Sequence, residues 1–373
     1  MNEPIRILHI VSTMNVGGLE SRLMDIYRFI DKSKVQFDFY TLRTSKGYFD
    51  NEIIQLGGKI FYSIPLTLKN FRTVQKDFDN FLKCNKYDIV HIHICETSPI
   101  LLSVAKKNGV THRIVHSRHA SVEKSIKSLA KILLKYLIPK YATDYYTVSE
   151  KAGYWLFGKK IMNRGYVKVI NNAIMASNFR YDPEKRAIKR EELSLNKSDI
   201  VIGLVGNFTK AKNHDFLIDV FNELTMISSD FKLLLIGSGT FEETIKKKCE
   251  KLKINKKVIF LGLRNDVDLL LQAMDVFVMP SLFEGMPGAA IEAQASGLPV
   301  LLSSNITKEA KICDSVKFLE LNDTPKKWAE QIISIYKTFD RKDAYKQIVD
   351  SGYDISVTSK EIENQYLRML ENH

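Results

Sequence analysis

One stretch of the chain decides the fold: Val276-Phe-Val-Met-Pro-Ser-Leu-Phe-Glu284-Gly-Met-Pro-Gly-Ala-Ala-Ile-Glu292-Ala-Gln-Ala-Ser-Gly297-Leu-Pro-Val300. Residues 276–279 form a continuous apolar run, which is typical of a parallel strand buried on both faces. Residues 285–288 permit a tight turn with exposed backbone N–H groups, and residues 289–295 favour a helix. Glu284 therefore stands in a turn and Glu292 inside a helix, where both can contact one elongated anionic ligand at the carboxyl end of the sheet.

Short apolar runs of the same kind alternate with helix-length segments along the whole chain. They lie at residues 5–11, 37–42, 59–64, 89–94, 112–116, 144–148 and 168–170, and then at 200–205, 232–236, 258–261, 276–279, 299–302 and 316–319. The alternation predicts an α/β fold with two doubly wound, Rossmann-like parallel sheets.

The length of 373 residues also favours two domains, and a composition of 45% hydrophobic and 26% charged residues is that of an ordinary globular protein. We expect an N-terminal domain over residues 1–175 and a C-terminal domain over residues 176–355. Residues 356–373 are expected to form a helix that packs back near the interdomain region, and the ligand is expected between the two domains.

The two glutamates carry a family resemblance. Glu284 is followed by Gly-x-Pro, and Glu292 begins the run Glu-Ala-x-Ala-x-Gly-x-Pro-Val. This pattern resembles the signature of the retaining glycosyltransferases of family 4, which share the two-domain GT-B fold. The residues around the two glutamates most resemble those of the transferases encoded in capsular and exopolysaccharide operons. The resemblance implies that Glu284, with Gly285, Met286, Pro287 and Gly288, holds the transferred sugar, and that Glu292 binds the ribose of the nucleotide. The alternative is a loop acid and a solvated helix acid.

In each domain, the loop that follows the first strand also carries candidate binding residues. Gly17 and Gly18 stand between a strand and a helix, where the resemblance implies contacts on the donor side, although a simple turn is the alternative. In the second domain, Lys212 matches the lysine that binds the donor diphosphate, while Asn207 replaces the usual arginine and carries no charge. Lys210 is a second candidate for the phosphate, and ordinary surface lysines are the alternative for both.

Two smaller turns of the second domain, at Gly239 and Arg264, resemble nucleotide-binding turns of the family. Asp266-Val-Asp268 reads as first-turn residues of a helix rather than as a metal motif. The best zinc candidate, His91-Ile-His93, alternates along a strand, and the resemblance implies chemistry without a metal. We therefore expect no metal and no cofactor apart from the UDP-sugar donor substrate.

Histidines gather at the end of one strand in the first domain. The resemblance implies a histidine there that faces the donor sugar or the acceptor. The register is ambiguous by one residue, so both His116 and His119 are candidates; His119 is the first choice because it lies beyond the strand in the loop, and His116 is the second. Such a histidine could deprotonate the acceptor hydroxyl, and core packing or surface solvation is the alternative for either.

The excess of positive charge lies in the first domain. Residues 1–175 hold 27 Lys and Arg against 14 Asp and Glu, a net charge of +13, whereas the net charge of the whole chain is +12. Lys124, Lys127, Lys131 and Lys135 recur at helical spacing beside an apolar stripe that includes Leu133 and Leu137. This pattern favours attachment to an anionic membrane surface; an ordinary surface helix and nucleic-acid binding are the alternatives, the latter without a supporting motif.

The sequence shows no secretion signal and no run of membrane-spanning length, and its four cysteines are scattered. We expect reduced thiols and a cytoplasmic protein peripheral on the inner face of the cell membrane.

The expected function is retaining transfer of a hexose from a UDP-sugar to a lipid-linked oligosaccharide in capsular or extracellular polysaccharide biosynthesis. A sugar-nucleotide epimerase of the same fold and a non-catalytic glycan-binding protein are the alternatives.

Overall fold

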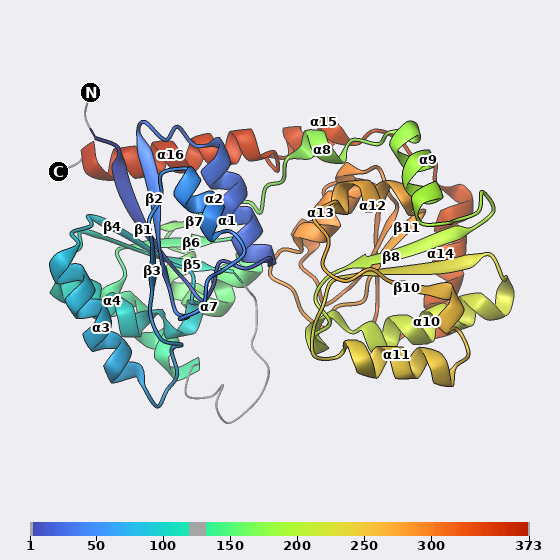
Figure 1. Cartoon of the computed structure of the whole chain (residues 1–373), viewed down its shortest axis with the longest axis horizontal. Coiled ribbons are helices and arrows are strands. Elements are labelled where there is room, and N and C mark those ends of the chain that lie inside the picture. The colour runs from blue at the N-terminus through green and yellow to red at the C-terminus, as the bar shows by residue number, and fades with distance from the viewer. Residues whose placement is uncertain (1–2, 119–131, 372–373) are drawn as a thin grey trace. The chain divides into compact units, whose positions relative to one another are not determined.

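A computed structural model describes residues 3–118 and 132–371. The chain forms two compact units (Figure 1). The first consists of Met1–Ala173 together with Ile355–His373, and the second of Ile174–Asp354. The C-terminal segment therefore belongs to the first unit.

The first unit is built on a seven-stranded, wholly parallel sheet with the order β3-β2-β1-β4-β5-β6-β7. Its strands are β1 (Ile5–Val11), β2 (Val35–Thr41), β3 (Ile60–Tyr62), β4 (Ile89–Ile92), β5 (His112–Ser117), β6 (Asp144–Thr147) and β7 (Val167–Val169). Its described helices are α1 (Gly18–Phe29), α2 (Asp50–Gln55), α3 (Phe71–Cys84), α4 (Ser98–Lys107), α6 (Ile138–Tyr141), α7 (Glu150–Met162) and α16 (Ile355–Glu371).

The two faces of this sheet bury different side chains. One face packs an apolar cluster that includes Leu8, Val90 and Phe78 from β1, β4 and α3. On the other face, Tyr27 of α1 stacks on Phe37 of β2 at 5.0 Å between ring centroids, and Tyr366 of α16 lies 6.0 Å from the same ring. The C-terminal helix α16 (red in Figure 1) thus completes the core of the first unit.

The second unit is built on a six-stranded parallel sheet with the order β10-β9-β8-β11-β12-β13. Its strands are β8 (Ile200–Val205), β9 (Phe231–Ile236), β10 (Val258–Phe260), β11 (Val276–Met279), β12 (Val300–Ser303) and β13 (Val316–Leu319). Its helices are α8 (Ala176–Phe179), α9 (Pro183–Glu192), α10 (His214–Ile227), α11 (Glu242–Lys251), α12 (Val267–Ala273), α13 (Gly288–Ala295), α14 (Pro325–Thr338) and α15 (Tyr345–Asp350).

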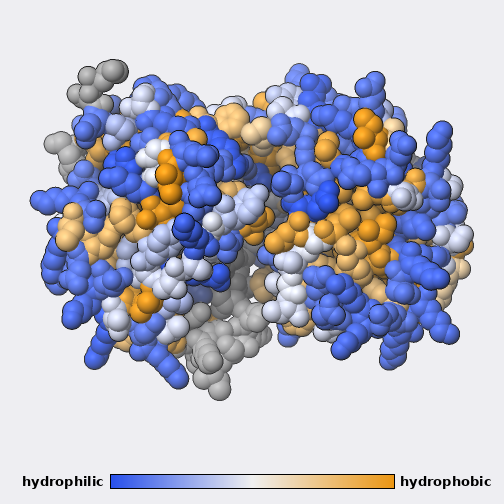
Figure 2. Space-filling view, in the orientation of Figure 1, coloured by the Kyte–Doolittle hydropathy of each residue, from blue (hydrophilic) through white to orange (hydrophobic). Residues whose placement is uncertain are grey.

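The predicted fold class is confirmed: both sheets are parallel, and every predicted strand is present. The continuous apolar runs are the reason, because strands such as β11 and β12 are buried along their whole length. None of the four cysteines, all of which lie within the described residues, forms a disulfide bond. The visible face of the first unit is mainly hydrophilic with scattered apolar patches, and that of the second unit has a broader apolar area across its middle (Figure 2). The described helices include none with the length and apolarity to cross a membrane.

Candidate functional site

The second sheet has one point at which its strand order reverses, between β8 and β11. In open parallel sheets, loops at the carboxyl ends of two such strands diverge and leave room for a ligand. The loop after β8 carries Lys212 and the loop after β11 carries Glu284. Their side chains meet in an ion pair of 2.7 Å between Lys212 Nζ and a Glu284 carboxylate oxygen, and each is less than one-fifth exposed. Two residues 72 positions apart in the sequence are thus brought together where a ligand would bind.

Hydrogen bonds between the two loops hold this pair in place. The backbone N–H of Leu282 donates to the Ala211 carbonyl at 2.8 Å, and Asn213 Nδ2 donates to the Pro280 carbonyl at 3.1 Å. Asn213 has a left-handed backbone, with φ of 56°, and directly precedes α10. Asparagine tolerates that conformation better than most residues do. Asn213 is a positioning residue that sequence reasoning missed, and its signal was an asparagine just before a helix.

Gly206 leaves room for the side chain of Lys212. A Cβ atom at Gly206 would lie 2.9 Å from Lys212 Cε, so a side chain there would push the lysine aside. The turns after neighbouring strands are also joined, because Phe208 N–H donates to the Ser238 carbonyl at 3.0 Å and Gly237 N–H donates to the Gly262 carbonyl at 2.8 Å. Predicted donor contacts Asn207 and Gly239 lie exposed on these turns. Their contact with the donor stays a prediction.

The glycine-rich turn leads into α13, and the second glutamate lies in the middle of this helix. This helix begins at Gly288, and its N-cap residue, Pro287, provides no side-chain cap for the first N–H groups. Met286 is 5% exposed and Glu292 is 7% exposed. The dipole of α13 favours an anion near its first turn, and the contacts predicted for Gly285 to Gly288 stay a prediction. Ribose binding by Glu292 stays a prediction.

Arg264 is held within its own loop. Its guanidinium donates to both carboxylate oxygens of Asp266 at 2.7 Å and lies 3.7 Å from Glu192. The hydrogen bonds from Arg264, together with Lys189, hold the pKa of Asp266 well below its usual range. Asp266 itself directly precedes α12. Arg264 can bind a nucleotide only with the groups that this ion pair leaves accessible, and its predicted role stays a prediction.

His214 is a second residue that sequence reasoning missed. It lies at the start of α10, is 2% exposed, and stacks on Phe208 at 4.2 Å between ring centroids. Burial, with a smaller contribution from Lys212, lowers the pKa of His214 to about 4, so the ring is neutral at pH 7. The positive charge at this end of the sheet therefore comes from Lys212 and not from the neighbouring histidine.

In the first unit, the predicted glycine pair lies at the start of α1. Gly17 is the N-cap residue, and Gly18 is the first residue of the helix. The Glu20 carboxylate folds back over Gly17, where a Cβ atom would lie 2.5 Å from it, while a Cβ atom at Gly18 would meet open space. Burial raises the pKa of Glu20. The room at Gly18 is consistent with close approach of a ligand, and the donor contact stays a prediction.

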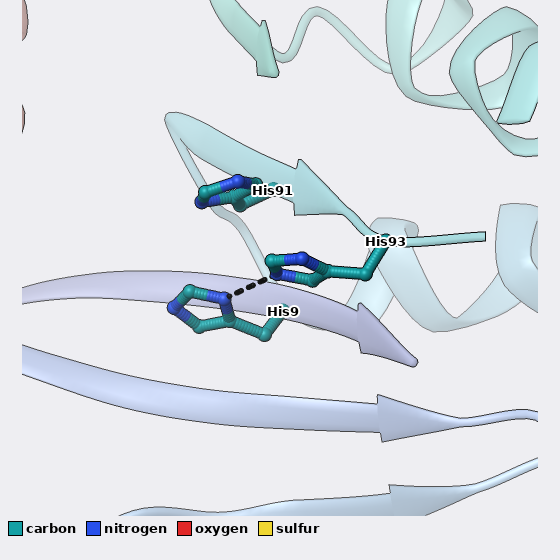
Figure 3. Close-up of side chains that lie close together, drawn as sticks. All are labelled: His9, His91 and His93. Carbon is teal, nitrogen blue, oxygen red and sulfur yellow. Dashed lines mark hydrogen bonds between the residues drawn. The ribbon is translucent and has the colours of Figure 1, made fainter. Parts of the chain in front are cut away.

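A layer of histidine side chains lies on one face of the first sheet, the face that α16 covers (Figure 3). His9 of β1 and His93 are joined by a hydrogen bond of 3.1 Å between Nδ1 and Nε2, and His91 is joined to His116 by one of 3.1 Å. The Tyr366 hydroxyl is joined to His91 Nδ1 at 2.7 Å. All four rings are at most 4% exposed. Burial lowers the pKa of each, that of His9 to about 3, so the layer is neutral at pH 7.

Three of these histidines lie close enough together to be considered as metal ligands, and the geometry of their rings bears on this possibility. Alternate residues of a strand share one face, so His91 and His93 lie together, and ligand atoms of His9, His91 and His93 are all within 4.8 Å of one another. However, the His91 and His93 rings are stacked, with centroids 4.3 Å apart, so their in-plane lone pairs run side by side instead of converging. Arg118 also donates to His93 Nδ1 at 3.4 Å, which makes that nitrogen an acceptor and leaves the proton on Nε2. This geometry favours packing of the three rings, and the absence of a metal stays a prediction.

The two candidate bases differ in what the structure describes. His116 is 1% exposed, inside the histidine layer, and this position favours the core-packing alternative. His119 lies outside the described residues, as do Lys124, Lys127 and Lys131. A base role for either histidine stays a prediction.

Comparisons with known proteins identify the family to which the chain belongs. The family model "Glycosyl transferases group 1" matches residues 185–350, and the model "Glycosyltransferase Family 4" matches residues 16–177. The chain is 34% identical over 332 residues to EpsF of Bacillus subtilis (strain 168), which is named as a glycosyltransferase, covering 88% of this chain and 86% of EpsF. It is 29% identical to CapH of Staphylococcus aureus, a capsular polysaccharide biosynthesis glycosyltransferase, over 97% of this chain and 99% of that protein.

A third relative has a name that states its reaction. It is the Escherichia coli UDP-Gal:alpha-D-GlcNAc-diphosphoundecaprenol alpha-1,3-galactosyltransferase, 26% identical over 80% of this chain and 79% of its own length. Among solved structures, Anabaena Alr3699/HepE in complex with UDP and glucose has the same fold, with a TM-score of 0.79 at 17% identity, covering 97% of this chain and 99% of that one. The predicted fold and enzyme class are thus confirmed, and the chain belongs to the family 4 (group 1) glycosyltransferases with the GT-B fold.

Proposed function

We propose that this glycosyltransferase moves a hexose from a UDP-sugar to a lipid-linked oligosaccharide in capsular or extracellular polysaccharide biosynthesis, with retention of the anomeric configuration. The observation that carries the proposal is the Lys212–Glu284 pair at the reversal point of the second sheet. The names of CapH and of the galactosyltransferase support the pathway, the UDP donor and the lipid-linked acceptor. The UDP and glucose complex of the Anabaena structure supports the donor class.

In this mechanism, the ion pair opens when the donor binds. Lys212 then stabilises the negative charge that grows on the leaving diphosphate, and Glu284 and the amides at the start of α13 hold the sugar. Glu292 binds the ribose. The acceptor oxygen attacks from the face of the leaving group, and the departing phosphate accepts its proton. No step requires a metal or a buried histidine.

Substitution of Glu284 tests the proposal. Glu284→Gln keeps the size of the side chain but removes the charge that pairs with Lys212 and contacts the sugar. We expect sugar transfer to a lipid-linked acceptor to fall about 100-fold or more, as for loss of one strong transition-state contact. The measurement is incorporation of radiolabelled sugar from a panel of UDP-sugars. Unchanged transfer by a folded Glu284→Gln variant would remove the basis of the proposal.

The same assay separates the two other functions. An epimerase would convert a UDP-sugar to its epimer without any acceptor, and a non-catalytic glycan-binding protein would bind glycan without turnover. Family membership and the paired Lys212 and Glu284 favour the transferase over both. We expect no epimer after incubation with UDP-sugars alone.

We also propose peripheral attachment to the inner face of the cell membrane through residues 133–140. In this segment, Leu133, Tyr136 and Leu137 are 60%, 70% and 43% exposed, at the spacing of one helical face. Lys140 supplies an exposed charge, while Lys135 is held by the Trp155 carbonyl at 2.7 Å. Exposed apolar side chains beside lysines fit the boundary between anionic headgroups and acyl chains.

Liposome sedimentation tests the membrane proposal. We expect binding to vesicles with anionic lipid, weakened by salt, and a decrease of about tenfold for the Leu133→Gln, Tyr136→Gln variant because apolar burial is lost. Met226→Gln is the matched control, since Met226 is an equally exposed apolar residue of the second unit, at 71%. Equal binding of both variants, or equal binding to neutral vesicles, would contradict the proposal.

A further inference from the structure

A polar groove lies on the first unit, between the edge strand β7 and the C-terminal helix α16. Its volume is about 380 Å³, and it is lined by Lys168, Val169, Glu361, Asn364, Gln365 and Arg368. This volume falls within the range of about 300–1,000 Å³ that is usual for small-molecule sites. β7 is the last strand of the sheet, so the groove is open along that edge.

Strand register places polar side chains in a row beneath this groove. His116, Tyr146 and Lys168 are direct partners across β5, β6 and β7 and therefore point to the same face. Lys168 Nζ lies 5.7 Å from the centre of the Tyr146 ring. The same face is covered by α16, because Tyr366 reaches His91 from it. The groove is thus the outer end of a polar layer that continues into the histidines.

Several groups of this layer have unused hydrogen-bonding capacity. Within the described part of the chain, Gln365 Oε1 and Tyr146 Oη are buried without a hydrogen-bond partner, and Gln365 is only 9% exposed. Lys168 forms no ion pair with any residue of 3–118 or 132–371. Glu361 accepts a hydrogen bond from Gln365 Nε2 at 3.2 Å, which leaves its other oxygen available. Buried oxygens such as those of Gln365 and Tyr146 are normally satisfied by water or by a ligand, whereas Lys168 and Glu361 are exposed at the mouth of the groove.

We propose that this groove binds a sugar unit of a glycan chain, as a second carbohydrate site that is separate from the Lys212–Glu284 pair. The groove offers donors from Lys168, Asn364 and Arg368 and acceptors from Gln365 and Glu361. A sugar hydroxyl both donates and accepts, so neighbouring hydroxyls can satisfy such a mixed set. A phosphate group would be attracted by Lys168 and Arg368, but as an acceptor it would leave the Gln365 and Glu361 oxygens without a donor. The composition of the groove therefore favours a neutral, hydroxyl-rich ligand.

Saturation-transfer NMR on the full chain tests the proposal, with D-glucose, D-galactose and N-acetyl-D-glucosamine as probes. We expect transfer to at least one of these sugars, and a decrease of about fivefold or more in the Lys168→Met, Asn364→Leu variant, which removes hydrogen-bond donors. Lys76→Met, Asn80→Leu is the matched control, because both of these residues are exposed on α3 of the same unit. The control should keep the signal.

A second variant guards against loss of structure. Val169→Trp fills the groove from the edge strand, where Val169 is 41% exposed, without removing a buried polar group. We expect it to lose the signal while its thermal unfolding stays that of the parent chain. The signal should also survive Glu284→Gln, so that failure of the transferase proposal is distinguishable. Equal signals from groove and control variants, no signal from any of the three sugars, or competition by inorganic phosphate would overturn the proposal.

Discussion

At the scale of single residues, the candidate site contains two opposite charges, on Lys212 and Glu284, that form an ion pair with each other. Lys212 and Glu284 form a 2.7 Å pair, and both are mostly buried. Removal of one member leaves the other charge in a partly desolvated place, which is costly in itself. A donor diphosphate would replace Glu284 as the partner of the lysine, so binding exchanges one ion pair for another.

Substitution of Lys212 tests this exchange. We expect Lys212→Met to lower kcat by about 100- to 1,000-fold, because the charge on the leaving diphosphate loses its counter-charge in the transition state. Lys210→Met is the matched control: Lys210 lies two residues earlier, is exposed, and makes no ion pair with any described residue. Steady-state kinetics with a saturating acceptor gives the comparison. Equal losses in the two variants would show that only the general positive charge of the loop matters.

A glycine in the neighbouring turn has a conformational role. Gly237 has φ of 136°, and a Cβ atom there would lie 2.3 Å from the Gly206 carbonyl oxygen. No L side chain is comfortable in that backbone region, and the obstacle is rigid main chain. We expect Gly237→Ala to destabilise the second unit by about 1–3 kcal/mol. Urea denaturation would measure this change, and Gly18→Ala, which meets open space, should have a much smaller effect.

At the scale of elements, the histidine layer makes the first sheet sensitive to acid. His9, His91, His93 and His116 come from three neighbouring strands and the loop after one of them. Burial is the largest cause of their lowered pKa values, and the Arg118 guanidinium lowers them further. A protonated ring here would be an unpaired charge among other rings and beside a cation. The folded sheet therefore excludes protons that the unfolded chain binds.

Stability should fall as the pH decreases below about 6.5. The unfolded histidines bind protons below that pH, whereas folded His9 does so only near its pKa of about 3. Their contribution is thus complete above pH 6.5 and is lost on acidification, with a slope of about 1.4 kcal/mol per pH unit for each histidine. Urea denaturation between pH 7.5 and 5 would measure the slope. We expect His9→Phe to make it shallower, and an unchanged slope would contradict this account.

At the scale of the whole molecule, the chain returns to its first unit at the end. α16 buries Ile362, Tyr366 and Met369, and its Glu363 carboxylate accepts a hydrogen bond from the backbone N–H of Asp31 at 2.8 Å. Burial of each apolar side chain contributes about 1.5–3 kcal/mol. These contributions are comparable to the total stability of many domains. The first unit is therefore complete only with the last residues of the sequence.

Separate expression of the two units tests this dependence. We expect residues 174–354 to fold alone with a cooperative thermal transition, because both ends of the second unit lie together at the Ile174–Asp354 bridge. Residues 1–173 should unfold at a much lower temperature unless residues 355–373 are joined to them by a short linker. Circular dichroism would follow both fragments. A stable transition for residues 1–173 alone would show that α16 is dispensable.

The sequence by itself determined the α/β class, the thirteen strands and the loops that carry Glu284 and Lys212. These features are local: a continuous apolar run predicts a buried parallel strand, and a glycine-rich turn before a helix predicts an anion site. The strand ends shifted by only one or two residues. The amino-acid types of a few neighbours suffice for such predictions.

Only the tertiary structure decided which distant residues meet. Strand order joined Lys212 to Glu284, and register brought His9, His91 and His116 into one layer with Tyr366 from α16. Packing of α16 on the sheet also buried His116, which the sequence had offered as a base. Hydrophobic periodicity fixes which face of a strand is buried, but it does not specify the neighbouring strand or the residue that lies opposite. Those choices come from the packing of the whole unit.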